Sequence, residues 1–162
     1  MDKFKAFVCL TSLVSNWMTL PFFRGDESQI GRRIQIFKQI FFHNLPELCE
    51  HFESEGILPQ IYLIEWVMTL FVRSLDLPVA SRMWDLIMLE GDIMILRIAV
   101  ALLKLIEKDV SQCSMDTILL TIKRLNQTLK DDNALVKLIY TIEIPEWVTI
   151  ELPRLMQEFV PK

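Results

Sequence analysis

Side chains that could bind a metal ion gather in one short stretch of this sequence. His43, Cys49 and His51 lie close together, and imidazole and thiolate groups are the ligands that zinc prefers. A structural zinc site needs a fourth ligand, which only the distant Cys9 or Cys113, or a carboxylate, could supply. Two histidines and a thiol near helix ends are ordinary features. We therefore expect no bound metal and no cofactor.

Two acidic side chains lie inside otherwise apolar stretches and could act as acids or bases. A buried carboxylate must be paired or hydrogen-bonded, and the candidate partners of Glu65 and Asp85 are Arg73, Arg82 and Arg97. A catalytic role for Asp85 would require a second catalytic group, and none accompanies it. We interpret both carboxylates as parts of structural ion pairs or helix caps, and predict no catalytic residue.

Motifs that bind phosphate or carry a nucleophile are missing. The four glycines, at positions 25, 31, 56 and 91, form no glycine-rich phosphate loop, and no Walker-type lysine follows any of them. The sequence contains no Gly-x-Ser-x-Gly elbow. The three cysteines are odd in number and widely spaced, which indicates reduced thiols and a cytoplasmic protein.

The stretch from Leu58 to Glu107 predicts three helices that organise the rest of the chain. The first begins at Pro59, and a second, from Pro78, ends at Gly91. Asp92 is placed to cap the third, which runs past Ile106. The first helix is apolar on two faces, so we expect neighbours on both sides to bury it; its apolar residues are Ile61, Ile64, Trp66, Met68, Leu70, Phe71 and Val72.

The remaining segments also show helical spacing of apolar residues. Helices are predicted over residues 7–17, 29–43, 47–54, 114–129 and 131–142, and a last one from Pro145 toward Phe159. A helix cap is expected in the turn Gly25–Ser28. No stretch shows the alternation of a strand, and no composition shift marks a boundary. The sequence predicts one all-α domain over residues 1–162, built from about seven to eight helices.

Three strings in this central stretch resemble a known family. They are Tyr62-x-x-x-Trp66-x-x-Thr69-Leu70-Phe71, Arg82-x-Trp84-Asp85 and Glu90-Gly91-Asp92. They resemble the C-terminal half of the TBC domain, the helical module that activates Rab-type small GTPases. The likeness runs from about Phe7 to Leu155 and is sharpest between Ile57 and Ala101. It implies structural roles for the motif residues, with both tryptophans in the core: Trp66, Thr69, Phe71, Arg82, Trp84, Asp85 and Gly91.

The family's two catalytic strings are not found in this sequence. Such domains supply an arginine from an Ile-x-x-Asp-x-x-Arg motif and a glutamine from a Tyr-x-Gln motif, both in the N-terminal half. Here Tyr62 is followed by Leu63 and Ile64, and Tyr140 by Thr141 and Ile142. The resemblance therefore implies half a domain without its catalytic edge, and no enzymatic activity in the chain as it stands.

Composition and charge narrow the partners. Apolar residues make up 52% of the chain, above the roughly 45–50% of soluble domains, which indicates a surface meant for a partner. That partner would be the N-terminal half of a TBC domain or a second copy of this chain. The net charge of −4 argues against nucleic acid. The one basic doublet, Arg32-Arg33, is expected on a solvated helix face.

The stretch between Lys5 and Arg24 is uncharged and is therefore a candidate for a membrane segment. A spanning helix needs about 20 predominantly apolar residues, and polar residues from Thr11 to Thr19, followed by Pro21, interrupt this one. We predict no integral membrane segment here. A buried amphipathic helix fits better, and its apolar face would consist of Phe7, Leu10, Leu13, Val14 and Trp17.

Two classes of function remain open at this point. The resemblance implies a partner of a Rab-type small GTPase in vesicle trafficking, active in GTP hydrolysis only when joined to the missing half. The alternative is a non-catalytic helical module for protein interaction or oligomerisation. In either case we expect a cytoplasmic protein that reaches membranes through its partners.

Overall fold

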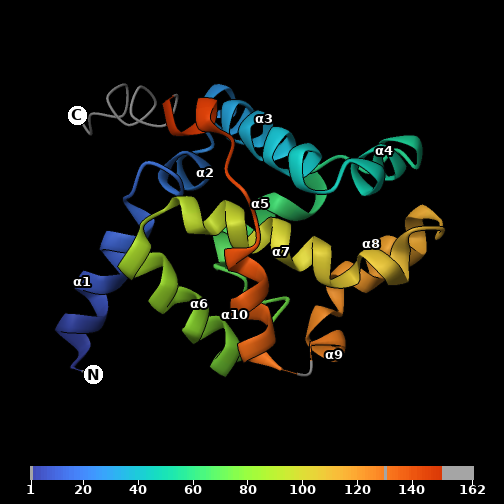
Figure 1. The fold of residues 1–162 in the computed structure, drawn as a ribbon. Coiled ribbons are helices and arrows are strands. Elements are labelled where there is room, and N and C mark those ends of the chain that lie inside the picture. The colour runs from blue at the N-terminus through green and yellow to red at the C-terminus, as the bar shows by residue number, and fades with distance from the viewer. Residues whose placement is uncertain (1, 130, 151–162) are drawn as a thin grey trace.

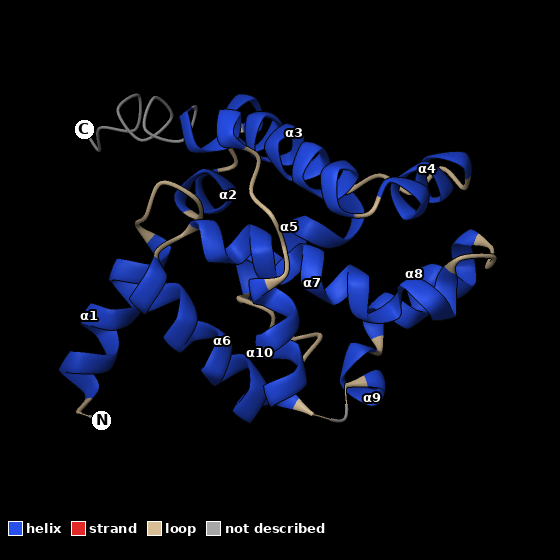
Figure 2. Ribbon diagram, viewed as in Figure 1, coloured by secondary structure: helices blue, strands red, loops and turns tan. Residues whose placement is uncertain are grey.

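Helices form all the regular secondary structure in the part of the chain that this computed structural model describes, residues 2–129 and 131–150 (Figures 1 and 2). Eight of them have nine residues or more, which confirms the predicted all-α array. Their bounds are α1 Lys3–Val14, α2 Leu20–Arg24, α3 Glu27–Asn44, α4 Pro46–Ser54, α5 Gln60–Thr69, α6 Leu77–Glu90, α7 Ile93–Val110, α8 Met115–Lys123, α9 Leu125–Thr128 and α10 Asp132–Tyr140.

Helix α7 is the centre of the fold. Between Met94 and Leu103 every residue except Arg97 is buried, because α3, α5, α6, α8, α9 and α10 all contact this helix (Figure 1). Fully burying a leucine or isoleucine side chain stabilises the fold by about 1.5–3 kcal/mol. Burial along α7 is therefore a main source of stability, and contacts with this helix position α5 and α6.

Several helix ends follow the signals in the sequence. Pro46 and Pro78 stand in the first turns of α4 and α6, where the missing N–H group is not needed. Gly91, with a φ of 90°, ends α6. The carboxylate of Asp26 accepts a 3.1 Å hydrogen bond from the backbone N–H of Gln29, so the cap expected between Gly25 and Ser28 is present.

Asp92 stands directly before α7, as predicted, but its side chain does not cap the helix. Asp92 has helical dihedral angles, φ −67° and ψ −22°, and its side chain makes no capping hydrogen bond. Its Oδ1 atom instead accepts a 2.8 Å bond from Nδ2 of Asn16 in the turn after α1. The carboxylate therefore ties the α1–α2 turn to the α6–α7 junction.

The end of α5 is unusual in its backbone. Leu70 and Phe71 have φ values of 47° and 67°, in the left-handed region that residues other than glycine seldom occupy. The N–H of Phe71 donates to the carbonyl of Trp66 at 3.0 Å, which closes the helix end. This turn ends α5 before the predicted break at Ser74.

Four other expectations are wrong. Helix α1 ends at Val14 and buries none of its residues, so it is no buried amphipathic helix. α5 buries one face only, since Ile61 and Met68 are exposed. Arg33 lies fully inside the protein instead of on a solvated face. The helix predicted over residues 114–129 breaks at Arg124 into α8 and α9.

The remaining differences concern short or terminal segments. Helix α2 was not predicted, because five residues are too few to show a period. Residues 146–150 are helical, as expected after Pro145, while Phe159 lies outside the described residues. Within the described ranges no helix combines the length and apolar character needed to cross a bilayer.

Candidate functional site

The exposed face of α5 is the most prominent candidate for an interaction site. Two apolar side chains on this helix and one just beyond each of its ends are between 41% and 55% exposed. We call this set the α5 ridge; it consists of Leu58, Ile61, Met68 and Val72. The opposite face, which carries Trp66, is buried against the core. The ridge is thus held rigidly while it remains open to solvent.

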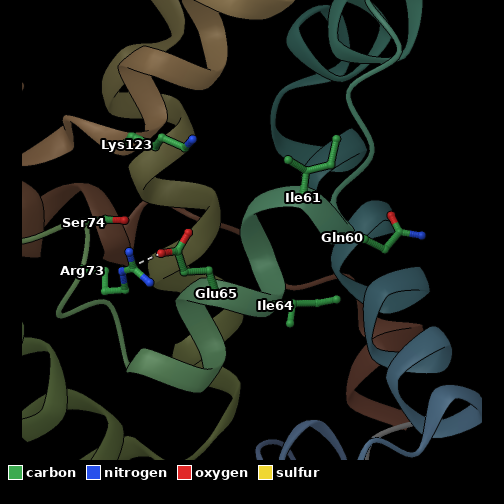
Figure 3. Close-up of a pocket in the computed structure, with 7 residues that line it drawn as sticks. All are labelled: Gln60, Ile61, Ile64, Glu65, Arg73, Ser74 and Lys123. Carbon is green, nitrogen blue, oxygen red and sulfur yellow. Dashed lines mark ion pairs between the residues drawn. The ribbon is translucent and has the colours of Figure 1, made fainter.

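A polar pocket of about 630 Å³ borders the first half of the ridge (Figure 3). Nε of Arg73 and Oε1 of Glu65 form an ion pair of 2.9 Å in it. Lys123 enters from α8 and brings a second cation. Two cations beside one carboxylate suit a polar or acidic segment of a protein partner. The complete lining is Gln60, Ile61, Ile64, Glu65, Arg73, Ser74 and Lys123.

An apolar groove of about 650 Å³ borders the other end of the ridge. One wall is α1 and the other is α6, and the last residues of α5 form its floor. In Figure 1 these two helices spread apart from a common end, near Val14 and Glu90, as the arms of a V. Asp85, on α6, is the acidic residue of its lining.

Four of the seven family-motif residues meet at the end of α5. Nε1 of Trp66 donates to Oγ of Ser74 at 2.9 Å, and Phe71 is fully buried. Oγ1 of Thr69 donates to the carbonyl of Glu65 at 2.7 Å. Trp84, half-buried on α6, also reaches this turn through its indole N–H, as described below.

The three remaining motif residues lie elsewhere. Arg82 donates to Oδ2 of Asp132 at 2.7 Å and to Oδ1 of Asn133 at 2.8 Å, which fastens α10 to α6. Asp85 is exposed on the groove wall and therefore needs no buried partner. Gly91 stands at the end of α6. Of the partners expected for Glu65 and Asp85, the structure brings only Arg73 into an ion pair, with Glu65.

The structure does not gather His43, Cys49 and His51 around one point. His43 lies 3.3 Å from a carboxylate oxygen of Glu143, and Nε2 of His51 donates to the carbonyl of Cys113 at 3.0 Å. Burial raises the pKa of the Cys49 thiol to about 11, so it is a poor nucleophile and metal ligand at neutral pH. Among the described residues no group of three potential ligands is placed to hold a metal ion.

Arg33, which is buried, and Asp92, which is half-buried, make tertiary contacts that their local sequence did not indicate. The guanidinium of Arg33 donates to the carbonyl of Trp17 through Nε at 3.0 Å and to the backbone and side chain of Gln29 through Nη1, both at 2.9 Å. Burial lowers its pKa to about 10, a change that nearby Asp26 partly offsets. It also lies 5.4 Å from the centre of the Trp17 ring. Arg33 therefore remains charged at neutral pH and holds the α1–α2 turn.

Asp92 is the second of these groups. Burial raises the pKa of its carboxyl group to about 6. The Asn16 side chain that bonds to it also accepts from the backbone N–H groups of Met18 and Thr19, at 3.0 and 2.8 Å. An acidic residue after a glycine is typical of a helix cap, so no local pattern indicated this tertiary contact.

Comparison with known proteins assigns the chain to a family. The model of the Rab-GTPase-TBC domain matches residues 1–111, up to the end of α7. Drainin of Dictyostelium discoideum is 33% identical over 146 residues, which cover 90% of this chain and 33% of that protein.

Two vertebrate relatives align over a shorter part. TBC1 domain family member 14 of Homo sapiens is 36% identical over 107 residues, and TBC1 domain family member 12 of Xenopus tropicalis is 35% identical over 107. Each alignment covers 66% of this chain, and 15% and 16% of the two relatives respectively. The chain thus spans a third or less of the length of these relatives, and it belongs to the Rab-GTPase-TBC family.

Proposed function

We propose that this chain binds a Rab-type small GTPase through the α5 ridge and its polar pocket. The main support is that this TBC-family chain exposes apolar side chains on one face of a packed helix, next to a charged pocket. An apolar centre with a polar rim is the usual anatomy of a protein interface. Met68 and Ile61 would supply the centre, with Arg73 and Lys123 at the rim.

The chain would support GTP hydrolysis only together with a segment that carries the family's arginine and glutamine. Such an arginine neutralises the charge that develops on the transferred phosphoryl group, and the glutamine positions the attacking water. Arg33 and Gln29 are hydrogen-bonded to each other, but Arg33 has no exposed surface and donates inward to Trp17. Arg73 and Arg82 are engaged in ion pairs. These contacts favour a catalytic arginine and glutamine that come from a segment outside this chain.

Binding is tested with a panel of Rab-type GTPases loaded with a non-hydrolysable GTP analogue. We expect at least one to bind, and Met68→Glu and Arg73→Glu each to weaken that binding about tenfold or more. Phe42→Glu is the matched control, because Phe42 is 52% exposed on α3, away from the ridge. Binding that survives both ridge substitutions, or no binding across the panel, would refute the proposal.

Hydrolysis is tested in single-turnover assays with the same panel. An arginine finger is worth about 10³–10⁵ in rate, so the chain alone should give no acceleration, whereas addition of a finger-bearing TBC half should. A hundredfold acceleration by the chain alone, abolished by substitution of one of its own arginines, would overturn this part of the proposal. The site of action would be cytoplasmic, at the membrane that carries the GTPase.

The second candidate is a non-catalytic helical module for protein interaction. The exposed apolar residues of α1, which no function in GTP hydrolysis explains, favour it. Self-association without GTPase binding in the panel assay would support this candidate over the first.

A further inference from the structure

Helix α1 carries apolar side chains on both of its sides and buries none of them. Its side facing the groove presents Cys9 and Leu13. Its outer side presents Phe4 and Phe7, which are 71% and 63% exposed. Lys3 and Lys5, in the first turn, are the charged residues of this helix. A helix with this distribution needs an apolar partner on each side.

The groove between α1 and α6 has a lining that suits an apolar helix. Its walls diverge from one end, and its lining is almost entirely apolar, from Leu10 and Leu13 on one side to Trp84 and Met88 on the other. An amphipathic helix that lays its apolar face into such a groove is a common mode of recognition.

We propose that two copies of this chain pair about a two-fold axis, with α1 of each copy lying in the groove of the other. The same molecule carries both complementary surfaces, the outer side of α1 and the groove. A two-fold axis then satisfies both at once, because such an interface uses the same patch on each subunit. The pairing is argued from α1 and the groove and not from the proposed GTPase site, although Met68 and Val72 belong to both surfaces.

The exposed area fits a dimer. Phenylalanine side chains bury about 150–250 Å² each, so the exposed fractions of Phe4, Phe7 and Phe23 amount to roughly 350 Å², to which Leu10 and Met88 add further apolar surface. A monomer seldom exposes an apolar patch beyond a few hundred Å², whereas a stable interface buries about 800 Å² on each partner.

Charge favours a second copy as the occupant. The exposed acidic residue on the groove wall is Asp85, and the entering helix would bring Lys3 and Lys5. Opposite charges on the two surfaces orient the encounter and suppress wrong partners. The helix that the groove selects is therefore apolar with a basic first turn, which describes α1 itself.

Light scattering and sedimentation over a concentration series measure the association. We expect a dimer at micromolar concentration, and a dissociation constant raised about tenfold or more by Phe7→Glu or by Met88→Lys. Both positions are more than half exposed, so circular dichroism and the melting temperature should remain unchanged. Leu120→Glu is the matched control, since Leu120 is 47% exposed on α8, far from α1 in Figure 1.

A mixture of the two variants tests the reciprocal geometry. The Phe7→Glu copy retains an intact groove and the Met88→Lys copy retains an intact α1. In a mixed dimer, native Phe7 of one copy meets native Met88 of the other. At the second contact, the introduced glutamate meets the introduced lysine. The mixture should therefore associate more tightly than either variant does alone.

Three outcomes would overturn the proposal. One is a monomer at high micromolar concentration, whether or not a separate TBC half then fills the groove. Another is a dimer that neither substitution weakens. The third is two variants that remain monomeric when mixed.

Discussion

The indole Nε1 of Trp84 donates a 2.9 Å hydrogen bond to the carbonyl oxygen of Leu70, where α5 turns into the left-handed region. The bond joins the middle of α6 to the end of α5. Left-handed backbone at Leu70 and Phe71 costs about 1–3 kcal/mol for each residue, because neither is glycine. The Trp84 bond and the burial of Phe71 are the contacts that offset this cost.

Replacement of Trp84 by phenylalanine tests this bond. Trp84→Phe retains most of the ring but removes the donor, and we expect the free energy of unfolding to fall by about 1–2 kcal/mol. Urea melts followed by circular dichroism measure it. Met88→Leu, an exposed change on the same helix, should cost less than about 0.5 kcal/mol. A Trp84→Phe melt identical to that of the parent would show that the Leu70 turn does not depend on the bond.

Arg33 should be far more sensitive to substitution than a surface arginine. Arg33→Ala removes the donors to Trp17 and Gln29 and leaves a cavity, so the free energy of unfolding should fall by about 2–4 kcal/mol. Arg24→Ala, at an exposed position, is the control and should cost less than about 0.5 kcal/mol. Thermal and urea melts of the two variants measure these changes. An equal decrease in the free energy of unfolding for both variants would contradict the burial of Arg33.

Asp92 should make the protein less stable as pH rises from about 4 to 6. Its carboxyl group titrates near 3.8 when unfolded and near 6 when folded, so in this window the unfolded state loses its proton first. The full difference corresponds to about 3 kcal/mol, and solvent screening of this half-buried group reduces it to about 1–2 kcal/mol. Above pH 6 both states are ionised and the loss is complete.

Asp92→Asn should abolish this pH dependence and stabilise the protein at pH 7, because the amide oxygen can still accept from Asn16. Unfolding measured every half pH unit from 3.5 to 7 checks it. Asp109→Asn, at an exposed position, should leave the pH profile of the parent intact. A profile that Asp92→Asn does not change would contradict the assignment.

The two hydrogen bonds from Arg82 to Asp132 and Asn133 should limit local unfolding of α10. The hydrogen bond with Arg82 lowers the pKa of the Asp132 carboxyl group below its ordinary value. Arg82→Gln should therefore return that pKa toward the ordinary value and speed amide hydrogen exchange within Asp132–Tyr140. Carboxyl titration and exchange followed by NMR measure both effects. Arg124→Gln, on an exposed residue outside α10, should change neither.

The sequence was sufficient for features that depend on neighbouring residues. Prolines at helix starts and Gly91 at a helix end act through their own backbone, so α4 and α6 were predicted closely. The apolar repeat of α7 indicated a buried helix, and the family strings indicated the TBC relationship. These signals are local, and no partner is needed to interpret them.

The features that the sequence missed depend on distant residues. Arg33 is buried because the carbonyl of Trp17, 16 positions earlier, accepts its guanidinium. The period of α5 identified an apolar face, but whether a neighbour covers Ile61 or Met68 depends on packing elsewhere. Leu70 and Phe71 carry no turn signal, since glycine or asparagine would be expected there. The groove likewise arises only when α1 and α6 meet.

The residues that the family model matches do not by themselves cover the central helix α7. The family match ends at residue 111, while α8, α9 and α10, which lie beyond it, cover one side of α7. A fragment cut after Ser111 would keep every matched residue and yet expose a stripe of leucine, isoleucine and valine that Leu135 and Ile139 now help to shield. Such a fragment should precipitate on expression, so any shortened version of this protein must retain α10.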